Sequence, residues 1–309
     1  MAGLSDIFKA VPGARPRLAC EIRQEGVIAG YAAAGKRGTQ ETALAFAPLH
    51  SGALTPGLKT PNLGDRAAVA AALESALSAT NARDRDTTLV IPDAAARVLL
   101  LEFDTLPSRR QDAMPVVKFR LRKMVPFDVE TAAVSYQVMA QKEAHMSVLV
   151  TVMPGEVLEE YESALRETGY EPGAVLPSTL AAAAGLRSEG AALMVNHTPG
   201  SVTTAVTNGS EMLLHRSMDL PAEENTREEE MAQAVITTLA WYEDTLRATP
   251  EKMHYAGPGG AQTARASRWL RFVDPAPPLE DLAPPAGASM MTNVPAGTTA
   301  GVTGALTIA

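Results

Sequence analysis

The sequence contains one cysteine, Cys20, and few aromatic residues, which make up 5% of its 309 residues. A single cysteine cannot form an internal disulfide, so a disulfide-stapled scaffold is excluded and a reducing compartment is favoured. Sparse aromatic side chains provide little stacking surface for nucleic-acid bases. Long apolar runs are also absent, since nowhere do about 18 consecutive apolar residues occur. We therefore expect neither a secretion signal nor a membrane-spanning helix.

Motifs for hydrolytic, metal and nucleotide chemistry are missing as well. The chain has no HExxH motif, no CxxC pair, no GxxxxGK[ST] phosphate loop and no GxSxG nucleophile elbow. Its five histidines are not spaced to place two on one helical face. We therefore predict no catalytic residue and no metal site.

Acidic residues outnumber basic ones, with 35 Asp and Glu against 27 Lys and Arg, which gives a net charge of −8 at pH 7. A general nucleic-acid-binding protein needs a positive surface that releases counterions from the phosphate backbone. We therefore expect a soluble protein with no nucleic-acid partner.

Three blocks of helices and strands follow a short amphipathic arm, residues 1–14, which either caps the fold or docks on a partner or membrane surface. The first block, 15–104, contains a helix over 65–78 with Asp65 in the capping position. Its expected strands are 18–22, 27–31, 87–91 and 98–103. Strands and a helix in this order predict a mixed sheet covered by helices.

The second block, residues 105–178, predicts a compact α+β subdomain with helices at 111–124 and 156–168 around two strands, 134–139 and 147–152. The third block, 179–309, repeats the plan of the first. Its expected strands are 191–195, 202–206 and 211–216, with Asn208-Gly209 as a hairpin signal, before a helix at 228–246. A proline-rich stretch, 274–295, predicts an extended surface connection, and 292–309 a terminal helix. The repeat indicates two related lobes.

A glycine-rich turn provides the best candidate for ligand binding. Gly257, Gly259 and Gly260 follow an expected strand at 253–256 and precede a helix near Gln262. Glycines there would allow backbone N–H groups to approach a nucleotide. The alternative is a strand-to-helix turn that needs glycine only for its positive φ.

A basic run within the second block provides candidate partner-binding residues, namely Lys118, Arg120, Arg122 and Lys123. Such a run is often a solvated helix face. The functional alternative is attraction to acidic lipid headgroups or to an acidic partner tail.

Three short segments follow one another in the second block: Leu106-Pro107 before a helix, then Val125-Pro126-Phe127-Asp128, then Val134-Ser135-Tyr136-Gln137-Val138. In the same order, they resemble the Leu-Pro, Ile-Pro-Phe and Asp-Tyr-Gln-Val of the type IV pilus assembly protein PilM family. The similarity covers most of the chain and is clearest over 87–185. It implies an FtsA-related, two-lobed actin-like (ribonuclease H-like) α/β fold with an inserted α+β subdomain, in which 15–104 and a reduced 179–309 form the lobes.

The sequence departs from this family where the family holds nucleotide. An acidic residue followed by Ile-Gly-Ser-Ser and a lysine forms the family's first phosphate turn, whereas here Glu21-Ile22 is followed by Arg23, Gln24 and Glu25, and Ile28 replaces the lysine. The family's second turn, Asp-Ile-Gly, is Asn196-His197-Thr198. A carboxylate at Glu25 would repel triphosphate. We therefore expect no ATP or Mg²⁺ cofactor and no enzymatic activity.

The resemblance implies a cytoplasmic scaffold of type IV pilus assembly, peripheral on the inner membrane. Its partner would be the cytoplasmic N-terminal peptide of a PilN-like inner-membrane protein, bound in a groove where the first lobe meets the inserted subdomain. Two alternatives stay open. One is an ATP-binding actin-like ATPase or sugar-kinase relative that uses the turn at Gly257–Gly260, and the other is the cytoplasmic actin-like component of a type II secretion system.

Overall fold

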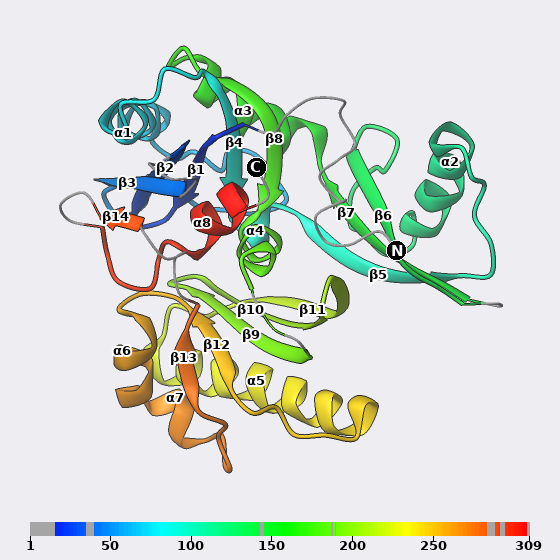
Figure 1. The fold of residues 1–309 in the computed structure, drawn as a ribbon. Helices are drawn as coiled ribbons and strands as arrows, with labels where there is room; N and C mark the ends of the chain where they lie inside the picture. Colours follow the sequence, from blue (N-terminus) through cyan, green and yellow to red (C-terminus); the bar gives the residue numbers. More distant parts are fainter. Residues whose placement is uncertain are drawn as a thin grey trace.

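The computed structural model describes residues 16–34, 40–142, 145–186, 188, 190–282, 288–290 and 294–307. Their strands form three sheets, which belong to two lobes and an inserted subdomain beside them (Figure 1). The expected N-terminal arm, residues 1–14, lies outside the described residues. Among the described helices, none combines the length and the apolar character needed to cross a bilayer.

The first lobe is built on a six-stranded sheet of order β14-β3-β2-β1-β4-β8. Its strands are β1 (Leu18–Arg23), β2 (Gly26–Ala34), β3 (Gln40–Pro48), β4 (Asp86–Ile91), β8 (Glu171–Pro177) and β14 (Ala288–Met290). The central strand β1 pairs antiparallel with β2 and parallel with β4. The predicted hairpin and the predicted buried strand at 87–91 are therefore confirmed.

The second lobe has a five-stranded sheet of order β11-β10-β9-β12-β13. Its strands are β9 (Ala191–Thr198), β10 (Ser201–Asn208), β11 (Glu211–Asp219), β12 (Met253–Ala256) and β13 (Leu279–Asp281). Gly209 has φ +57° in the β10–β11 hairpin, as the Asn-Gly signal predicted. When the strands of each lobe are numbered in chain order and β14 is left aside, the strands of both sheets lie side by side in the order 3-2-1-4-5. This order confirms the predicted repeat, and β14 is an addition at the edge of the first sheet.

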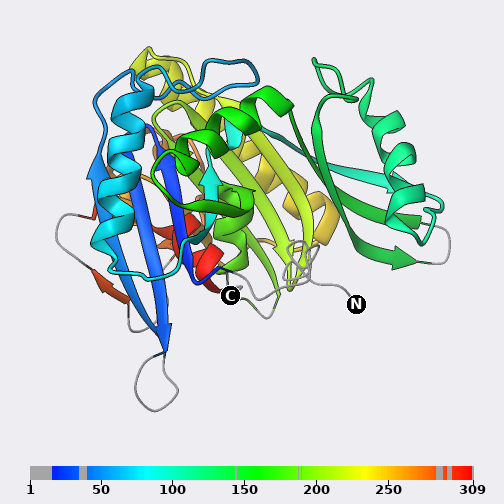
Figure 2. The same ribbon diagram turned by 90° about the horizontal axis from the view of Figure 1, so that it is seen from above.

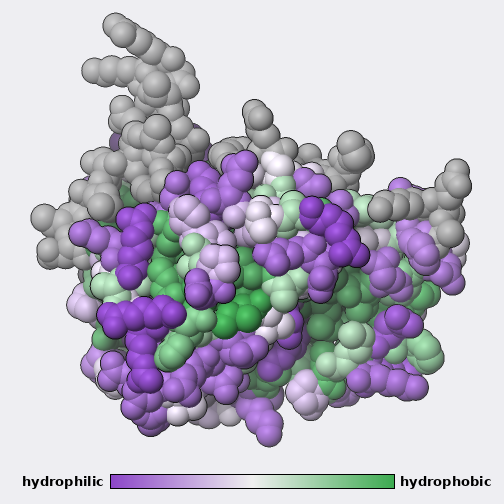
Figure 3. Space-filling model, turned by 90° about the horizontal axis from the view of Figure 1, so that it is seen from below, coloured by the Kyte–Doolittle hydropathy of each residue, from purple (hydrophilic) through white to green (hydrophobic). Residues whose placement is uncertain are grey.

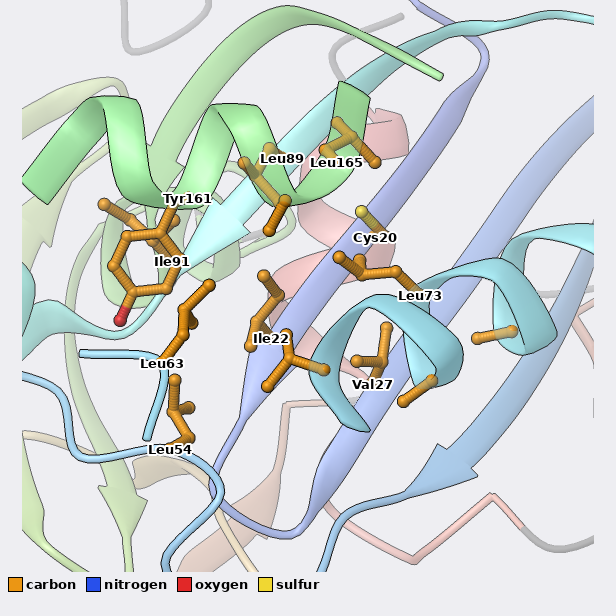
Figure 4. Close-up of a cluster of buried hydrophobic side chains, with 14 of the residues drawn as sticks. Cys20, Ile22, Val27, Leu54, Leu63, Leu73, Leu89, Ile91, Tyr161 and Leu165 are labelled. Atoms are coloured by element: carbon orange, nitrogen blue, oxygen red, sulfur yellow. The ribbon is translucent and has the colours of Figure 1, made fainter. Parts of the chain in front are cut away.

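Helices cover both faces of the first sheet. Because side chains alternate along β1, Cys20 and Ile22 face α1 (Arg66–Ala79) and α3 (Gly155–Arg166), whereas Ala19 faces α4 (Ser178–Ala184) and α8 (Ala300–Thr307). Figure 4 shows Leu73 of α1 beside Cys20 of β1, and Tyr161 of α3 beside Ile91 of β4, within one buried cluster. Asp65 caps α1 by accepting the Ala68 N–H, which confirms its predicted role.

One face of the second sheet packs on α5 (Glu224–Leu246), α6 (Gly260–Ala266) and α7 (Arg268–Arg271). Helix α5 begins four residues before the predicted start at 228, because the Glu223 carboxylate accepts the N–H groups of Asn225 and Thr226 as an N-cap. These hydrogen bonds, led by those with Thr226, lower the pKa of Glu223 to about 2.

The inserted subdomain is a three-stranded sheet of order β5-β7-β6 with one helix, α2 (Arg110–Leu121). Its strands are β5 (Arg97–Phe103), β6 (Ala133–Lys142) and β7 (His145–Met153). Val148, Val150 and Val152 of β7 pack under Val117 and Leu121 of α2. The other face, through Leu149 and residues such as Val98 and Met139, shares a core with Met194 and Met212 of the second lobe. The subdomain therefore rests on the second lobe as well as on the first.

The strand pairings place the boundaries differently from the sequence-based division at 104 and 178. Strand β5, assigned to the first lobe, pairs with β7 of the inserted sheet. Helix α3 and strand β8, assigned to the inserted subdomain, pack in or pair with the first lobe. Helix α8 and β14, assigned to the second lobe, also join the first. The proline-rich stretch 274–295 thus contributes an edge strand to each lobe, β13 and β14, besides connecting them.

Candidate functional site

The corresponding hairpins of the two lobes, β1–β2 and β9–β10, meet at the lobe interface. The Arg23 guanidinium at the end of β1 donates to the carbonyl of His197, from Nη2 at 3.4 Å. Gln24 lies against Gly200 so closely that a Cβ there would be 3.0 Å from its Oε1. The two turns that the sequence analysis compared with phosphate-binding turns are therefore in contact with each other.

Arg23 is a buried cation placed between two carboxylates of its own hairpin. Its side chain is 4% exposed, and Nη1 donates to Glu21 Oε1 at 3.0 Å. Its Nε lies 3.7 Å from Glu25 Oε2. Burial alone would lower the pKa of Arg23, but the carboxylates of Glu21 and Glu25 outweigh burial and raise it. Burial raises the pKa of Glu21, and the Arg23 cation opposes that rise. The pair is thus stabilised mutually in a dry environment.

A second polar layer joins Glu21 to the second lobe through neutral groups. The Ser178 hydroxyl donates to Glu21 Oε1 at 2.7 Å. Asn196 of β9 donates to Ser178 Oγ at 3.1 Å and to Thr179 Oγ1 at 2.9 Å. Asp93, after β4, accepts the Thr179 N–H at 3.0 Å and the Thr179 hydroxyl. Both lobes and the start of α4 are therefore connected through one buried hydrogen-bond network.

His197 is held neutral beside this network. Its Nδ1 shares a hydrogen bond of 2.9 Å with the Tyr255 hydroxyl. Burial, followed by the charges of Arg23 and Arg227, lowers the pKa of His197 to about 4. Tyr255 in turn stacks on the buried Trp269, with ring centroids 6.4 Å apart. The second lobe thus presents dipoles rather than charge to Arg23.

The candidate glycines Gly257, Gly259 and Gly260 form the turn between β12 and α6. Gly259 and Gly260 have φ of +74° and +68°, the geometry that the strand-to-helix alternative requires. Gly257 donates its N–H to Gly297 at 2.8 Å, and Gly260 donates to Gly257 at 3.0 Å. The next N–H, that of Ala261, donates to Asp281 Oδ1 at 2.6 Å. A carboxylate of the chain itself therefore lies at the N-terminus of α6.

The basic run lies on α2 and the turn after it, in a different part of the molecule from the glycine turn (Figure 1). Arg122 pairs with Glu130 at 2.6 Å, and Lys118 donates to the Glu130 carbonyl at 3.3 Å. Arg120 lies over the ring of Phe103, 5.8 Å from its centroid. Lys123 is exposed. The structure thus does not bring the two groups of candidate residues together.

Sequence reasoning noted Glu21 as a match to the family's acidic residue and Arg23 and Asn196 as departures from a nucleotide site, and it missed the network they form. Ser178, Asp93 and Asp281 were not considered. One signal was present, because the charges of Glu21 and Arg23 within an otherwise apolar strand require buried partners.

Two lobes with one strand order, joined at their first hairpins and carrying a subdomain inserted after the fourth strand, define an actin-like fold. The solved PilM-PilN type IV pilus biogenesis complex has a chain of this fold, which matches with a TM-score of 0.75 at 16% identity, over 96% of this chain and 98% of that one. The predicted fold class and the resemblance to PilM are therefore confirmed.

Two further solved structures share the fold. The cytoplasmic domain of EpsL, an inner-membrane component of the type II secretion system of Vibrio cholerae, matches with a TM-score of 0.50 at 14% identity, over 94% of this chain and 92% of that one. A Bacteroides thetaiotaomicron protein with an actin-like ATPase fold and unknown function matches with a TM-score of 0.52 at 9% identity, over 94% of this chain and 95% of that one. No protein-family model and no curated protein matches the sequence.

Proposed function

We propose that this chain is an actin-like scaffold of a type IV pilus machine, held at the cytoplasmic face of the inner membrane by an extended peptide of a PilN-like protein. The observation that carries the proposal is the likeness of nearly the whole chain, inserted subdomain included, to the PilM chain of the PilM-PilN complex. The family resemblance at Val125-Pro126-Phe127 and Tyr136-Gln137-Val138 supports the same assignment independently.

Strand β8 is our candidate for the peptide-binding element. It is an edge strand that pairs only with β4 within the sheet order, and residues 171–175 are exposed or half-buried. In the chain the inserted sheet lies between β4 and α3, which β8 follows, and in space it lies on this side of the first lobe (Figures 1 and 2). An extended peptide can add to such an edge through main-chain hydrogen bonds.

The scaffold works without nucleotide and without catalysis in this proposal. Arg23 replaces the small residue that the family places in its first phosphate turn, and its guanidinium is neutralised by Glu21 and Glu25. The Asp281 carboxylate takes the Ala261 N–H beside the glycine turn. Gly297 packs on the same turn, where a Cβ would be 2.1 Å from the Gly257 carbonyl. These residues do not fit a triphosphate and Mg²⁺, because carboxylates and protein backbone take the places that phosphate needs.

The peptide test uses a synthetic N-terminal peptide of the PilN-like partner and two versions of it with N-methyl groups on alternate residues. In an added strand only one set of alternate amides faces β8. We expect the unmodified peptide to bind with micromolar or tighter affinity by calorimetry. One methylated version should lose at least about tenfold in affinity, because two or more hydrogen bonds disappear, and the other should bind unchanged.

Absence of binding by the unmodified peptide contradicts the pilus assignment and favours the type II secretion alternative, which the same fold in EpsL supports. Equal binding by both methylated versions contradicts strand addition at β8 and indicates recognition through side chains instead.

The nucleotide test measures thermal unfolding of the full chain with and without millimolar ATP and Mg²⁺. A ligand that binds the folded state stabilises it by RT ln(1 + [L]/Kd). We expect no shift in Tm, since Arg23 and Asp281 hold the polar groups that a nucleotide would use. A rise of several degrees would favour the ATPase alternative.

A further inference from the structure

Helix α2 and the turn after it expose large apolar side chains to solvent. Phe119 is 66% exposed, Met124 47% and Val116 38%. Elsewhere in the described part of the chain, the large apolar residues that are comparably exposed are Ile236 and Phe272 of the second lobe. Helix α2 lies at the outer edge of the inserted subdomain, and no other helix or strand of the described residues covers its outer side (Figures 1 and 2). This is an unpartnered helix face.

Cations share this face with the apolar side chains. Positions 116, 119, 120 and 123 recur at helical spacing, on a side of α2 and the turn after it that differs from the stripe of the buried Ala113, Val117 and Leu121. Arg120 and Lys123 therefore lie on the same side as Phe119. The helical spacing extends to Lys123 because Arg122, which follows the last residue of α2, keeps helical backbone angles. Neither Arg120 nor Lys123 forms an ion pair within the described residues, in contrast to Arg122 and Lys118, which pair with Glu130. The local charge is positive on a chain of net charge −8.

The second lobe also exposes large apolar side chains, but its longest helix is acidic. Hydrophobic side chains interrupt the polar surface of the face seen from below (Figure 3). In the described part of the second lobe, the exposed large apolar residues are Ile236 of α5 and Phe272 after α7. Helix α5, however, carries six acidic residues, Glu224, Glu228, Glu229, Glu230, Glu243 and Asp244, and one basic residue, Arg227. Beside Phe272, the cation Arg268 of α7 pairs with Glu229 of α5 at 3.7 Å. Helix α5 as a whole therefore repels an anionic surface, whereas α2 attracts one.

We propose that the α2 face, defined as Val116, Phe119, Arg120, Lys123 and Met124, seats on the anionic phospholipid surface of a bilayer. Lipid fits better than an acidic protein because the side chain of Phe119 is 66% exposed on a helix at the outer edge of the subdomain. A fluid interface accepts apolar side chains without a complementary shape, while Arg and Lys meet the headgroups. The groove of about 460 Å³ beside α2 lies on another side of the helix, along Gln111, Met114, Lys118 and Arg122, with the Glu130 carboxylate in its wall.

The identity of the bilayer as the inner membrane rests on the proposed function, whereas the lipid contact itself follows from the α2 face. Sedimentation of the full chain with vesicles tests the contact, using phosphatidylcholine alone and an equal mixture of phosphatidylcholine and phosphatidylglycerol. We expect binding only to the anionic vesicles, weakened by salt. Arg120→Gln/Lys123→Gln should weaken it roughly 25-fold, at about fivefold for each cation. Phe119→Ser, which leaves the net charge of the chain unchanged, should also weaken binding to the anionic vesicles.

Matched controls come from the second lobe. Arg268→Gln/Arg271→Gln changes the net charge equally, and Phe272→Ser removes an exposed ring of the same kind; both should bind vesicles as the unmodified chain does. Equal losses in the control and α2 variants, or no vesicle binding at all, overturn the proposal. Binding of an acidic peptide that the α2 variants abolish, without vesicle binding, assigns the face to a protein instead.

The partner-peptide titration is repeated on Phe119→Ser. Retained peptide affinity with lost vesicle binding supports two separate contacts. Vesicle binding without peptide binding leaves the α2 face standing and refutes the PilN-like assignment, so the two failures are distinguishable.

Discussion

The first and second lobes share one strand order but differ in what their first hairpins present to each other. In the first lobe the end of β1 and the turn after it carry alternating charges, Glu21, Arg23 and Glu25, whereas β9 ends in the neutral Asn196, His197 and Thr198. The first lobe supplies both signs of charge, and the second supplies dipoles. The comparison teaches that the two lobes of an actin-like fold can be joined at their first hairpins by a buried cation and hydrogen bonds of the chain itself.

The covering of the two sheets also differs. The first sheet is enclosed by helices on both faces, and the α4–α8 pair is packed so closely that a Cβ at Gly304 would lie 1.9 Å from the Ala181 carbonyl. The second sheet has helices on one face and rests on the inserted sheet and α4 with the other. The first lobe is thus the self-contained one, and the second depends on its neighbours for half its core.

The largest predicted effect comes from removing the charge that only the first hairpin carries. Arg23→Met leaves Glu21 and Glu25 buried without a counter-charge, so the free energy of unfolding in urea should fall by about 3–5 kcal/mol. Arg271→Met, at an exposed position of α7, should change it by less than about 0.5 kcal/mol. Adding Glu21→Gln to Arg23→Met should restore part of the loss. Equal effects of Arg23→Met and Arg271→Met would refute the role of the buried cation.

The next largest effect is a pH dependence of stability that comes from His197 in the neutral β9–β10 hairpin. The folded-state pKa of His197 is about 4, below the 6.5 of an unperturbed histidine, so the unfolded state binds the extra proton first. Stability should therefore fall as the pH drops from about 6.5 to about 4, by about 3 kcal/mol for this group. Urea unfolding across this range should show a shallower slope for His197→Asn.

A control for this titration lies at the surface of the first lobe. Hydrogen bonding with Ser51 and Asp65 raises the pKa of the exposed His50, so its contribution has the opposite sign and is lost as the pH rises. His50→Asn should leave the slope between pH 4 and 6.5 nearly unchanged. An unchanged slope in His197→Asn would show that other groups carry the pH dependence.

The smallest effect tests the close packing of α8 against α4 in the first lobe. Gly304→Ala gains helix propensity of about 1 kcal/mol but places a methyl group on the Ala181 carbonyl, so we expect a net loss of about 1–3 kcal/mol. Thermal unfolding measures it as a lower Tm. Gly57→Ala is the control, since a Cβ there meets no atom within 4 Å. A higher Tm for Gly304→Ala would mean that α8 can shift away from α4 at little cost.

Local patterns predicted elements well and their membership of sheets poorly. Asp65 at a cap, Asn208-Gly209 in a hairpin and the apolar alternation of β1 each act over a few residues, and each was confirmed. The placement of β5 in the inserted sheet and of α3 in the first lobe depends on partners far away in sequence. Periodicity shows that a face is apolar and does not say what covers it.

The candidate site divides in the same way. The positive φ of Gly259 and Gly260 followed from their sequence alone, as did the basic character of α2. That Arg23 reaches His197, that Asn196 reaches Ser178 and that Asp281 caps α6 required the fold, since these pairs are separated by 174, 18 and 20 residues.

The sequence by itself determined the repeated order of strands and helices, because hydrophobic alternation and turn residues act locally. Only the tertiary structure decided that the two equivalent hairpins close on a buried guanidinium. That outcome depends on desolvation and charge pairing between segments that are adjacent only after folding.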